Sequence, residues 1–235
     1  MNRALAKLSL LLFAATPGAW ADEIVYDKNV DTVVPDGSTS GVLSTIEVAE
    51  LGTIDSLRIT LNLEVPDGAT GFTGDLYAYV QHGDRIAVLL NRPGRDSGRP
   101  SGYDDSVNLS VTFDDSAARG DIHGYRAALN GSHAIPLTFS LTGLWQPDGR
   151  IADPDSVLLS HARSAMLSEF TGEDSEGAWT IFVSDVSSGG QIRFTDWRLA
   201  ATFTPIPEPN LCMTAALLAL GFAVRQTRRR RNVVF

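Results

Sequence analysis

The sequence predicts an all-β domain, an antiparallel β-sandwich of the jelly-roll type. Short segments in which apolar and polar residues alternate recur along the chain, most clearly at 57–64, where Leu57, Ile59 and Leu61 alternate with polar residues. Glycine, proline and aspartate separate these segments, and no window of 11 or more residues within 22–204 has a convincing helical period. Alternation indicates half-buried strands, and many short strands joined by turns are typical of a sandwich.

The strands are expected in the following order. The run at 57–64 ends at the turn Pro66-Asp67-Gly68. The runs at 76–81 and 85–90 flank His82-Gly83-Asp84 and predict a hairpin. Further strands are expected at 108–113, 135–141, 179–183 and 192–203, and a glycine- and proline-rich loop at 91–102.

Three tryptophans receive different interpretations. Trp179 and Trp197 alternate in phase with apolar neighbours, so we expect them in the core rather than exposed as sugar-stacking rings. Trp145 lies in the glycine-bounded turn 143–149 and is the better candidate for an exposed contact. Residues 22–41 show no clear pattern and are expected to form a loose lead-in before the main domain at 42–204.

Residues 1–21 have the pattern of a signal peptide. Arg3 and Lys7 precede a short apolar run at 8–15, and Ala19-Trp20-Ala21 is a small-x-small cleavage site. We expect export by the Sec machinery and cleavage by signal peptidase before Asp22.

Residues 205–235 have the pattern of a membrane-targeting tail. Pro207, Glu208 and Pro209 precede an apolar run at 211–224, which as a helix would span roughly 21 Å. Because a bilayer core is roughly 30 Å thick, this short transmembrane helix is expected to insert only marginally or transiently. The basic residues after it would keep its end in the cytoplasm; they are Arg225, Arg228, Arg229, Arg230 and Arg231.

The charge between these two segments is strongly acidic. Residues 22–204 keep 12 basic and 27 acidic residues, a net charge of about −15, against −9 for the whole chain. This charge argues against nucleic acid as a partner and favours solubility outside the cell. The single cysteine, Cys212, lies in the tail, so 22–204 offers no disulfide, thiol nucleophile or cysteine zinc site.

Candidate catalytic groups are few. The four histidines occur in turns, loops or strand starts, and the segment 37–41 has threonine where a G-x-S-x-G nucleophile would have serine. No H-E-x-x-H zinc motif is present. The sequence therefore predicts no catalysis by this chain, with a hydrolase that uses an unfamiliar site as the alternative.

Acidic pairs suggest a calcium hypothesis. Two aspartate pairs flank the strand at 108–113, and a further aspartate begins a strand expected nearby; the candidate ligands are Asp75, Asp104, Asp105, Asp114 and Asp115. None of these matches an EF-hand loop. The alternative, that each aspartate caps a turn, stays open.

The ordered motifs of 42–203 resemble the P domain (P/Homo B domain) that follows the catalytic domain of subtilisin-like proprotein convertases. The segments that carry this resemblance are Gly74-Asp75-Leu76, Phe113-Asp114-Asp115, Gly177-Ala178-Trp179-Thr180 and Trp197-Arg198-Leu199. The resemblance implies a β-sandwich that stabilises or modulates a serine endopeptidase without cleaving peptides. Residues 150–166 exceed the family pattern and are expected to form an elaborated loop.

The tail resembles the PEP-CTERM sorting signal of Gram-negative envelope proteins. This resemblance implies processing near Pro207-Glu208-Pro209 by an exosortase-type membrane enzyme, and release to the cell envelope, outer surface or extracellular matrix. We therefore expect a non-catalytic exported module whose partner is an exopolysaccharide or a separate protease. A component of proteolysis, or a hydrolase with an unrecognised site, remains the alternative.

Overall fold

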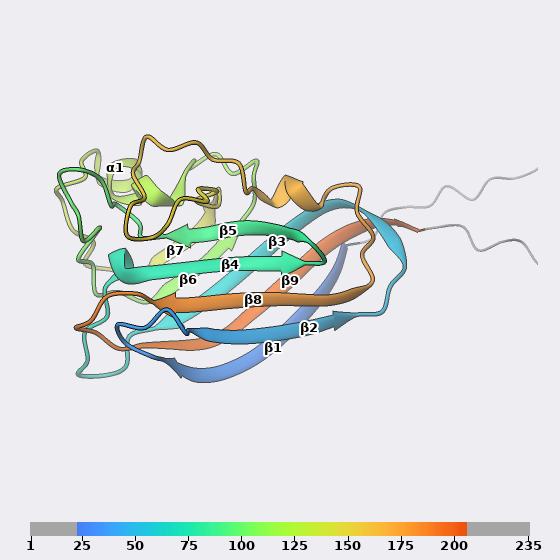
Figure 1. Cartoon of the computed structure of the whole chain (residues 1–235), viewed down its shortest axis with the longest axis horizontal. Helices are drawn as coiled ribbons and strands as arrows, with labels where there is room; N and C mark the ends of the chain where they lie inside the picture. Colours follow the sequence, from blue (N-terminus) through green and yellow to red (C-terminus); the bar gives the residue numbers. More distant parts are fainter. Residues whose placement is uncertain (1–22, 206–235) are drawn as a thin grey trace, which may run out of the picture.

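A computed structural model describes residues 23–205, which form two packed sheets with loops gathered at one end (Figure 1). The predicted signal peptide, the Pro207-Glu208-Pro209 motif, the apolar run and the arginine cluster lie outside the described residues. Between Glu23 and Pro205 no helix is long and apolar enough to cross a membrane. The strands are β1 (Glu23–Val34), β2 (Val42–Val48), β3 (Gly52–Glu64), β4 (Leu76–His82), β5 (Arg85–Asn91), β6 (Leu109–Phe113), β7 (Leu141–Trp145), β8 (Gly177–Asp185) and β9 (Ile192–Pro205).

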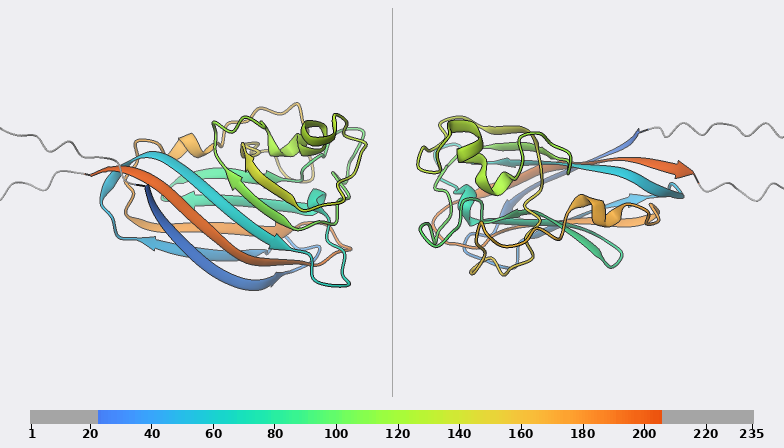
Figure 2. Two further views of the ribbon diagram at one scale, coloured as in Figure 1. Left: turned by 180° about the vertical axis from the view of Figure 1, so that it is seen from behind. Right: turned by 90° about the horizontal axis from the view of Figure 1, so that it is seen from above.

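The strands form a five-stranded sheet A, in the order β1-β9-β3-β6-β7, and a four-stranded sheet B, in the order β2-β8-β4-β5. Figure 2 shows the two sheets as separate layers from above. The predicted sandwich is confirmed, as is the β4–β5 hairpin. Every pairing is antiparallel except β6 with β7, because the long connection between them returns the chain to the starting end of β6. That connection holds the helix α1 (Tyr125–Asn130) and the 3-10 helix η2 (Ile122–Gly124).

We expected a loose lead-in at 22–41, but residues 23–34 of it form a strand of sheet A. Strand β1 pairs with β9 from Glu23↔Thr202 to Val34↔Ile192, with one register shift. Ile24, Tyr26 and Val30 pack against the core, while most other β1 side chains are exposed. Most residues of β1 are polar, so the sequence shows no clear alternation. This is because an edge strand at the rim of a sandwich buries only part of one face.

The predicted strand at 135–141 is also wrong. Strand β7 begins only at Leu141, and residues 135–140 form an irregular segment in which Ile135 and Phe139 are exposed. Leu137 alone of this segment is deeply buried, and its N–H donates to the carboxylate of Asp105. The Asp105 carboxylate thus accepts the Leu137 N–H, which in a strand would be accepted by a carbonyl of the neighbouring strand.

The core lies between the two sheets. Trp179 and Trp197 are fully buried, as predicted, and so is Trp145, which we had expected to be exposed. The parallel register pairs Trp145 with Phe113, and this pairing turns its indole toward the inside of sheet A. The indole N–H donates to the carbonyl of Thr142, so the buried ring keeps its polar group satisfied.

The 150–166 segment forms an irregular loop, as expected, and lies along the outer edge of sheet B. Strand β5 continues its hydrogen bonding into this region, since Val88 N–H donates to the carbonyl of Ala165 and Gly149 N–H to that of Val88. The free edge of β5 is therefore covered rather than exposed. The 3-10 helix η3 (Leu167–Phe170) follows the loop and returns the chain to β8.

Candidate functional site

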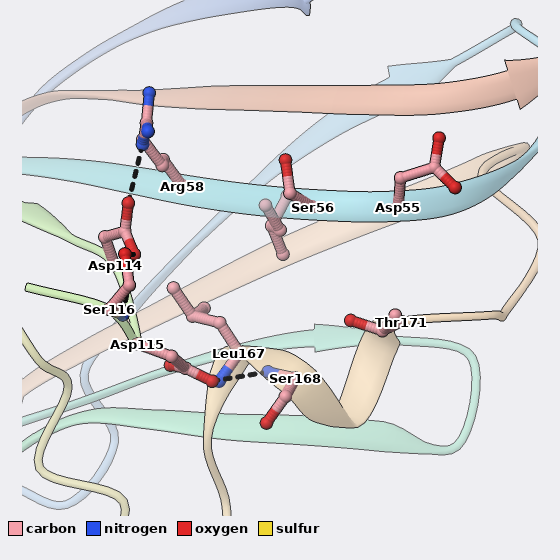
Figure 3. Close-up of a pocket in the computed structure, with 10 residues that line it drawn as sticks. Asp55, Ser56, Arg58, Asp114, Asp115, Ser116, Leu167, Ser168 and Thr171 are labelled. Carbon is pink, nitrogen blue, oxygen red and sulfur yellow. Dashed lines mark hydrogen bonds and ion pairs between the residues drawn. The ribbon is translucent and has the colours of Figure 1, made fainter. Parts of the chain in front are cut away.

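A hollow of about 260 Å³ lies between strand β3 and the helix η3 (Figure 3). Strand β3 contributes polar side chains on its outer face, the 114–116 turn follows β6, and η3 forms the opposite wall. The hollow is lined by Asp55, Ser56, Leu57, Arg58, Asp114, Asp115, Ser116, Leu167, Ser168 and Thr171. Two of the predicted calcium ligands, Asp114 and Asp115, therefore lie in its wall.

Asp114 is held by a cation and a hydroxyl. Arg58 Nε donates to its carboxylate over 2.8 Å, and Ser116 Oγ donates over 2.6 Å. Burial opposes ionisation of Asp114, but these hydrogen bonds outweigh it and lower the carboxyl pKa. The guanidinium is half-exposed, so this ion pair forms a charged rim to the hollow.

Asp115 fixes the opposite wall. Its two carboxylate oxygens accept the backbone N–H groups of Leu167 at 3.0 Å and Ser168 at 2.8 Å, as Figure 3 shows. These amides begin η3 and have no partner within the helix, so the side chain acts as a remote cap. The carboxylate is thus committed to the backbone.

Replacing Asp115 by alanine is expected to lower the free energy of unfolding by about 1 kcal/mol, the usual effect of losing a helix cap. Hydrogen exchange should quicken at the Leu167 and Ser168 amides. Urea unfolding and amide exchange of the two proteins measure these effects. Asp115→Asn keeps one acceptor oxygen and serves as the control. Unchanged exchange at both amides would show that the cap is unimportant.

The hollow suits a small polar ligand better than a reaction. The hydroxyls of Ser168 and Thr171 face it without a hydrogen bond to another described residue, and Leu57 and Leu167 form its apolar floor. No histidine lines it. Hydroxyls over a small apolar floor, with one ion pair at the rim, can hold a small polar ligand.

The structure does not gather the five candidate calcium ligands at one place. Among residues 23–205 no group of three or more histidine, cysteine or acidic side chains is arranged to hold a metal ion. The carboxylates are bound by arginine side chains or, in the case of Asp115, by the backbone amides of η3, where a calcium ion was expected. Asp75 pairs with Arg92 at 3.3 Å, Asp114 with Arg58, and Asp104 and Asp105 both pair with Arg126.

Arg126 holds the most buried of these carboxylates. Its Nε and Nη2 donate to the two oxygens of Asp105 over 2.8 and 2.7 Å, a bidentate pair. Asp105 also accepts from the Tyr125 hydroxyl and from the backbone N–H of Leu137. The guanidinium lies 4.5 Å from the centre of the Tyr103 ring. This cluster joins α1 to the loop before β6, and it could not be predicted from the sequence because its partners are about 20 residues apart.

Two buried aspartates, Asp75 and Asp185, lie near each other at the end of sheet B where the loops gather. The backbone joins them because Val186 N–H donates to the carbonyl of Asp75. Burial raises the pKa of Asp185 to about 7 and that of Asp75 to about 6, with Arg92 partly offsetting the effect. One oxygen of Asp185, Oδ2, is buried without a hydrogen-bond partner.

This pair should make stability depend on pH. An unfolded aspartate has a pKa of about 3.9, so the folded state holds these protons more tightly. Their destabilising effect is therefore absent below about pH 4 and grows as the pH rises to about 7. Asp185→Asn should gain stability relative to the parent between pH 4 and pH 8 in urea titrations. The exposed Asp84→Asn variant is the control, and a pH-independent difference for Asp185→Asn would contradict the assignment.

All four histidines lie within the described residues, and each is engaged by other groups. His82 stacks on Trp179 and bonds the carbonyls of Ala178 and Asp174. His123 is fully buried between the Asp148 carboxylate at 2.7 Å and the carbonyl of Arg95. The other two make equally local contacts: His133 with the Tyr103 hydroxyl and His161 with the N–H of Leu158.

The His123–Asp148 pair resembles half of a catalytic triad but lacks the third member. Both ring nitrogens of His123 already have partners, and neither partner is a hydroxyl or thiol. Asp148 also binds Arg150 at 3.0 Å, and Arg150 pairs with Asp121 at 2.7 Å. The arrangement is a buried ionic network that fixes the start of the 150–166 loop.

No family model and no curated protein matches this sequence. Two solved structures are similar: a serine protease of Aeromonas sobria in complex with the chaperone ORF2, at 12% identity and TM-score 0.44, and the serine protease itself, at 13% and 0.42. These alignments cover 82% and 81% of this chain but only 28% of each matched chain. Identities and scores this low carry no information on function.

Proposed function

We propose that the chain is a non-catalytic exported binding module, a stand-alone domain of the P-domain type. The observation that supports it best is the state of the histidines. Each one contacts backbone groups, an aromatic ring, a structural carboxylate or, for His133, the Tyr103 hydroxyl, and none is hydrogen-bonded to a serine, threonine or cysteine side chain. The polar hollow beside η3 offers ligand contacts, and its Asp114 and Asp115 carboxylates are held by Arg58, Ser116 and the η3 amides.

The terminal segments supply the rest of the proposal. The signal peptide at 1–21 would direct export, and the tail at 205–235 would hold the protein transiently at the membrane until an exosortase-type enzyme cuts near Pro207-Glu208-Pro209. The product would reach the envelope, outer surface or extracellular matrix, where its work is to bind an exopolysaccharide or to modulate a separate protease.

The non-catalytic role is tested by measuring whether the purified protein turns over peptide or glycan substrates. Protein expressed as the full chain and purified should release no product from broad peptide and glycan panels. Turnover that disappears in His123→Gln or His82→Gln would instead establish a hydrolase with an unrecognised site. Turnover that survives both variants indicates a contaminating enzyme, which further purification would remove.

The sorting role is tested by mass spectrometry of the released protein, which gives its two termini. The protein released by the native host should have lost residues 1–21 and should end near Pro207-Glu208-Pro209. Glu208→Ala is the matched variant, and it should leave more protein in the membrane fraction. An intact tail in the released protein would contradict the proposed processing while leaving the non-catalytic role open to its own test.

A further inference from the structure

The outer face of sheet B differs in kind from the outer face of sheet A. In β2, β8 and β4, alternate side chains point away from the core, and Figure 1 looks onto the sheet that carries them. We call the exposed and half-exposed members of this set the aromatic face: Leu43, Thr45, Glu47, Tyr77, Tyr79, Gln81, Ala178, Thr180 and Phe182. Glu47 is the only charged residue among them.

Three aromatic rings form the centre of the aromatic face. The Tyr79 and Phe182 rings are stacked with centroids 5.0 Å apart, and the Tyr77 ring lies 5.9 Å from that of Tyr79. Leu43 pairs with Phe182 across the strands and is 63% exposed. All three rings are only half-buried. Apolar surface of this kind, gathered on one face and left in water, indicates a binding surface.

The rings are held in place before any partner arrives. Gly41 approaches Phe182 so closely that a Cβ there would lie 2.5 Å from the ring. Gly41 also has a φ of +54°, a conformation that side chains rarely adopt, so two constraints keep glycine beside this ring. A fixed ring loses little conformational entropy when a ligand packs on it.

Polar groups without protein partners surround the rings. Neither the Tyr77 nor the Tyr79 hydroxyl has a hydrogen-bond partner among the described residues. The two cross-strand neighbours of Tyr77 each keep a buried oxygen without a partner, namely Ser184 Oγ and Asn91 Oδ1. The two interior oxygens are closed off from solvent, so the groups open to a ligand are the Tyr77 and Tyr79 hydroxyls, which can exchange hydrogen bonds with a ligand hydroxyl directly or through a water.

The outer face of sheet A provides the comparison within the same molecule. It carries ion pairs between Arg198 and Asp27 at 2.6 Å, Arg193 and Asp31 at 2.9 Å, and Arg58 and Glu23 at 3.4 Å. The domain, with a net charge of about −15, thus places ion pairs over sheet A, while the outward side of β2, β8 and β4 presents only one charged residue, Glu47. The remaining strand of sheet B, β5, carries Arg85 at its N-terminal end, where it pairs with Glu169 and Glu173. The aromatic face matches an uncharged partner, since a charged one would lose water without gaining an ion pair.

We propose that the aromatic face binds an uncharged polysaccharide chain. Exposed rings pack against the apolar C–H surfaces of sugar rings, and the tyrosyl, threonyl and glutamine groups can exchange hydrogen bonds with sugar hydroxyls. An open face that crosses three strands suits an extended polymer better than a small molecule. This inference rests on the proposed role as a non-catalytic binding module and names the class of its partner.

Depletion assays test the proposal. Full-chain protein is mixed with insoluble cellulose, chitin or β-1,3-glucan, and with the anionic polymer alginate. At least one neutral polymer should remove the protein from solution, and alginate should not. Leu43→Thr should bind roughly 2- to 10-fold more weakly and Tyr79→Ala about tenfold or more. Val25→Thr makes the same kind of change at an exposed position on β1 and should bind like the parent.

Several results would overturn the proposal. These are a lack of retention by every neutral polymer, or equal retention of the parent, Leu43→Thr and Tyr79→Ala. Sedimentation that shows a dimer dissociated by Leu43→Thr would make the aromatic face an interface between copies of the chain. If Tyr79→Ala fails to fold, Tyr79→Phe takes its place, because it keeps the ring packing and removes only the hydroxyl. Failure here leaves the non-catalytic and exported roles intact, since turnover and mass test those.

Discussion

Trp197→Ala is expected to lower the free energy of unfolding by about 3–5 kcal/mol, the usual effect of deleting a buried tryptophan. Trp197 is fully buried in β9, the strand that pairs with both β1 and β3. Its indole N–H donates to Ser44 Oγ over 2.9 Å, across the core from sheet A to sheet B. The substitution therefore opens a cavity and also leaves a buried hydroxyl without its partner.

Urea unfolding followed by far-ultraviolet circular dichroism measures this effect without depending on the deleted fluorophore. Trp197→Phe fills most of the cavity but cannot donate to Ser44, so it should cost less than the alanine variant. The difference between the two variants separates packing from the hydrogen bond. A loss below about 1 kcal/mol for Trp197→Ala would mean that the ring is not in the core.

Removing the arginine of the Asp105–Arg126 pair should be comparably damaging. Arg126→Met is expected to cost about 3–5 kcal/mol, because it leaves the fully buried Asp105 carboxylate without its bidentate cation. The remaining donors, the Tyr125 hydroxyl and the Leu137 N–H, cannot neutralise the charge.

The double variant Asp105→Asn/Arg126→Met is the control for this prediction. It removes the buried charge together with its partner, so it should be more stable than Arg126→Met alone. Thermal unfolding of the four proteins in the cycle gives the coupling between the two residues. A double variant that is no more stable than Arg126→Met would show that the charge is not the cause.

The sequence predicted the strands that bury one complete face. At 57–63 in β3, 76–80 in β4 and 179–183 in β8, every second residue is apolar and its side chain enters the core. The same reasoning placed Trp179 and Trp197 correctly, since their in-phase neighbours are apolar. It failed for β1, where Ile24, Tyr26 and Val30 are only partly buried and the exposed Lys28 interrupts the alternation between them.

The sites were less accessible to sequence reasoning than the fold. Asp104, Asp105 and Asp114 looked like calcium ligands because they gather along the chain, but their partners are arginines far from them in sequence. The aromatic face was missed for a related reason. Tyr77, Tyr79 and Phe182 come from two strands about 100 residues apart, and only the β4–β8 register brings their rings together.

The β1–β9 pairing has a mechanical consequence. Glu23 pairs with Thr202, so the described chain enters and leaves the sandwich at the same end (Figure 2). A force pulling Glu23 and Pro205 apart would open the β1–β9 hydrogen bonds one at a time. A force on Pro205 against a partner held on sheet B would instead pull β9 lengthwise, loading its bonds to β1 and β3 together. The domain should therefore resist being dragged by its C-terminal strand far better than being unzipped from its two ends.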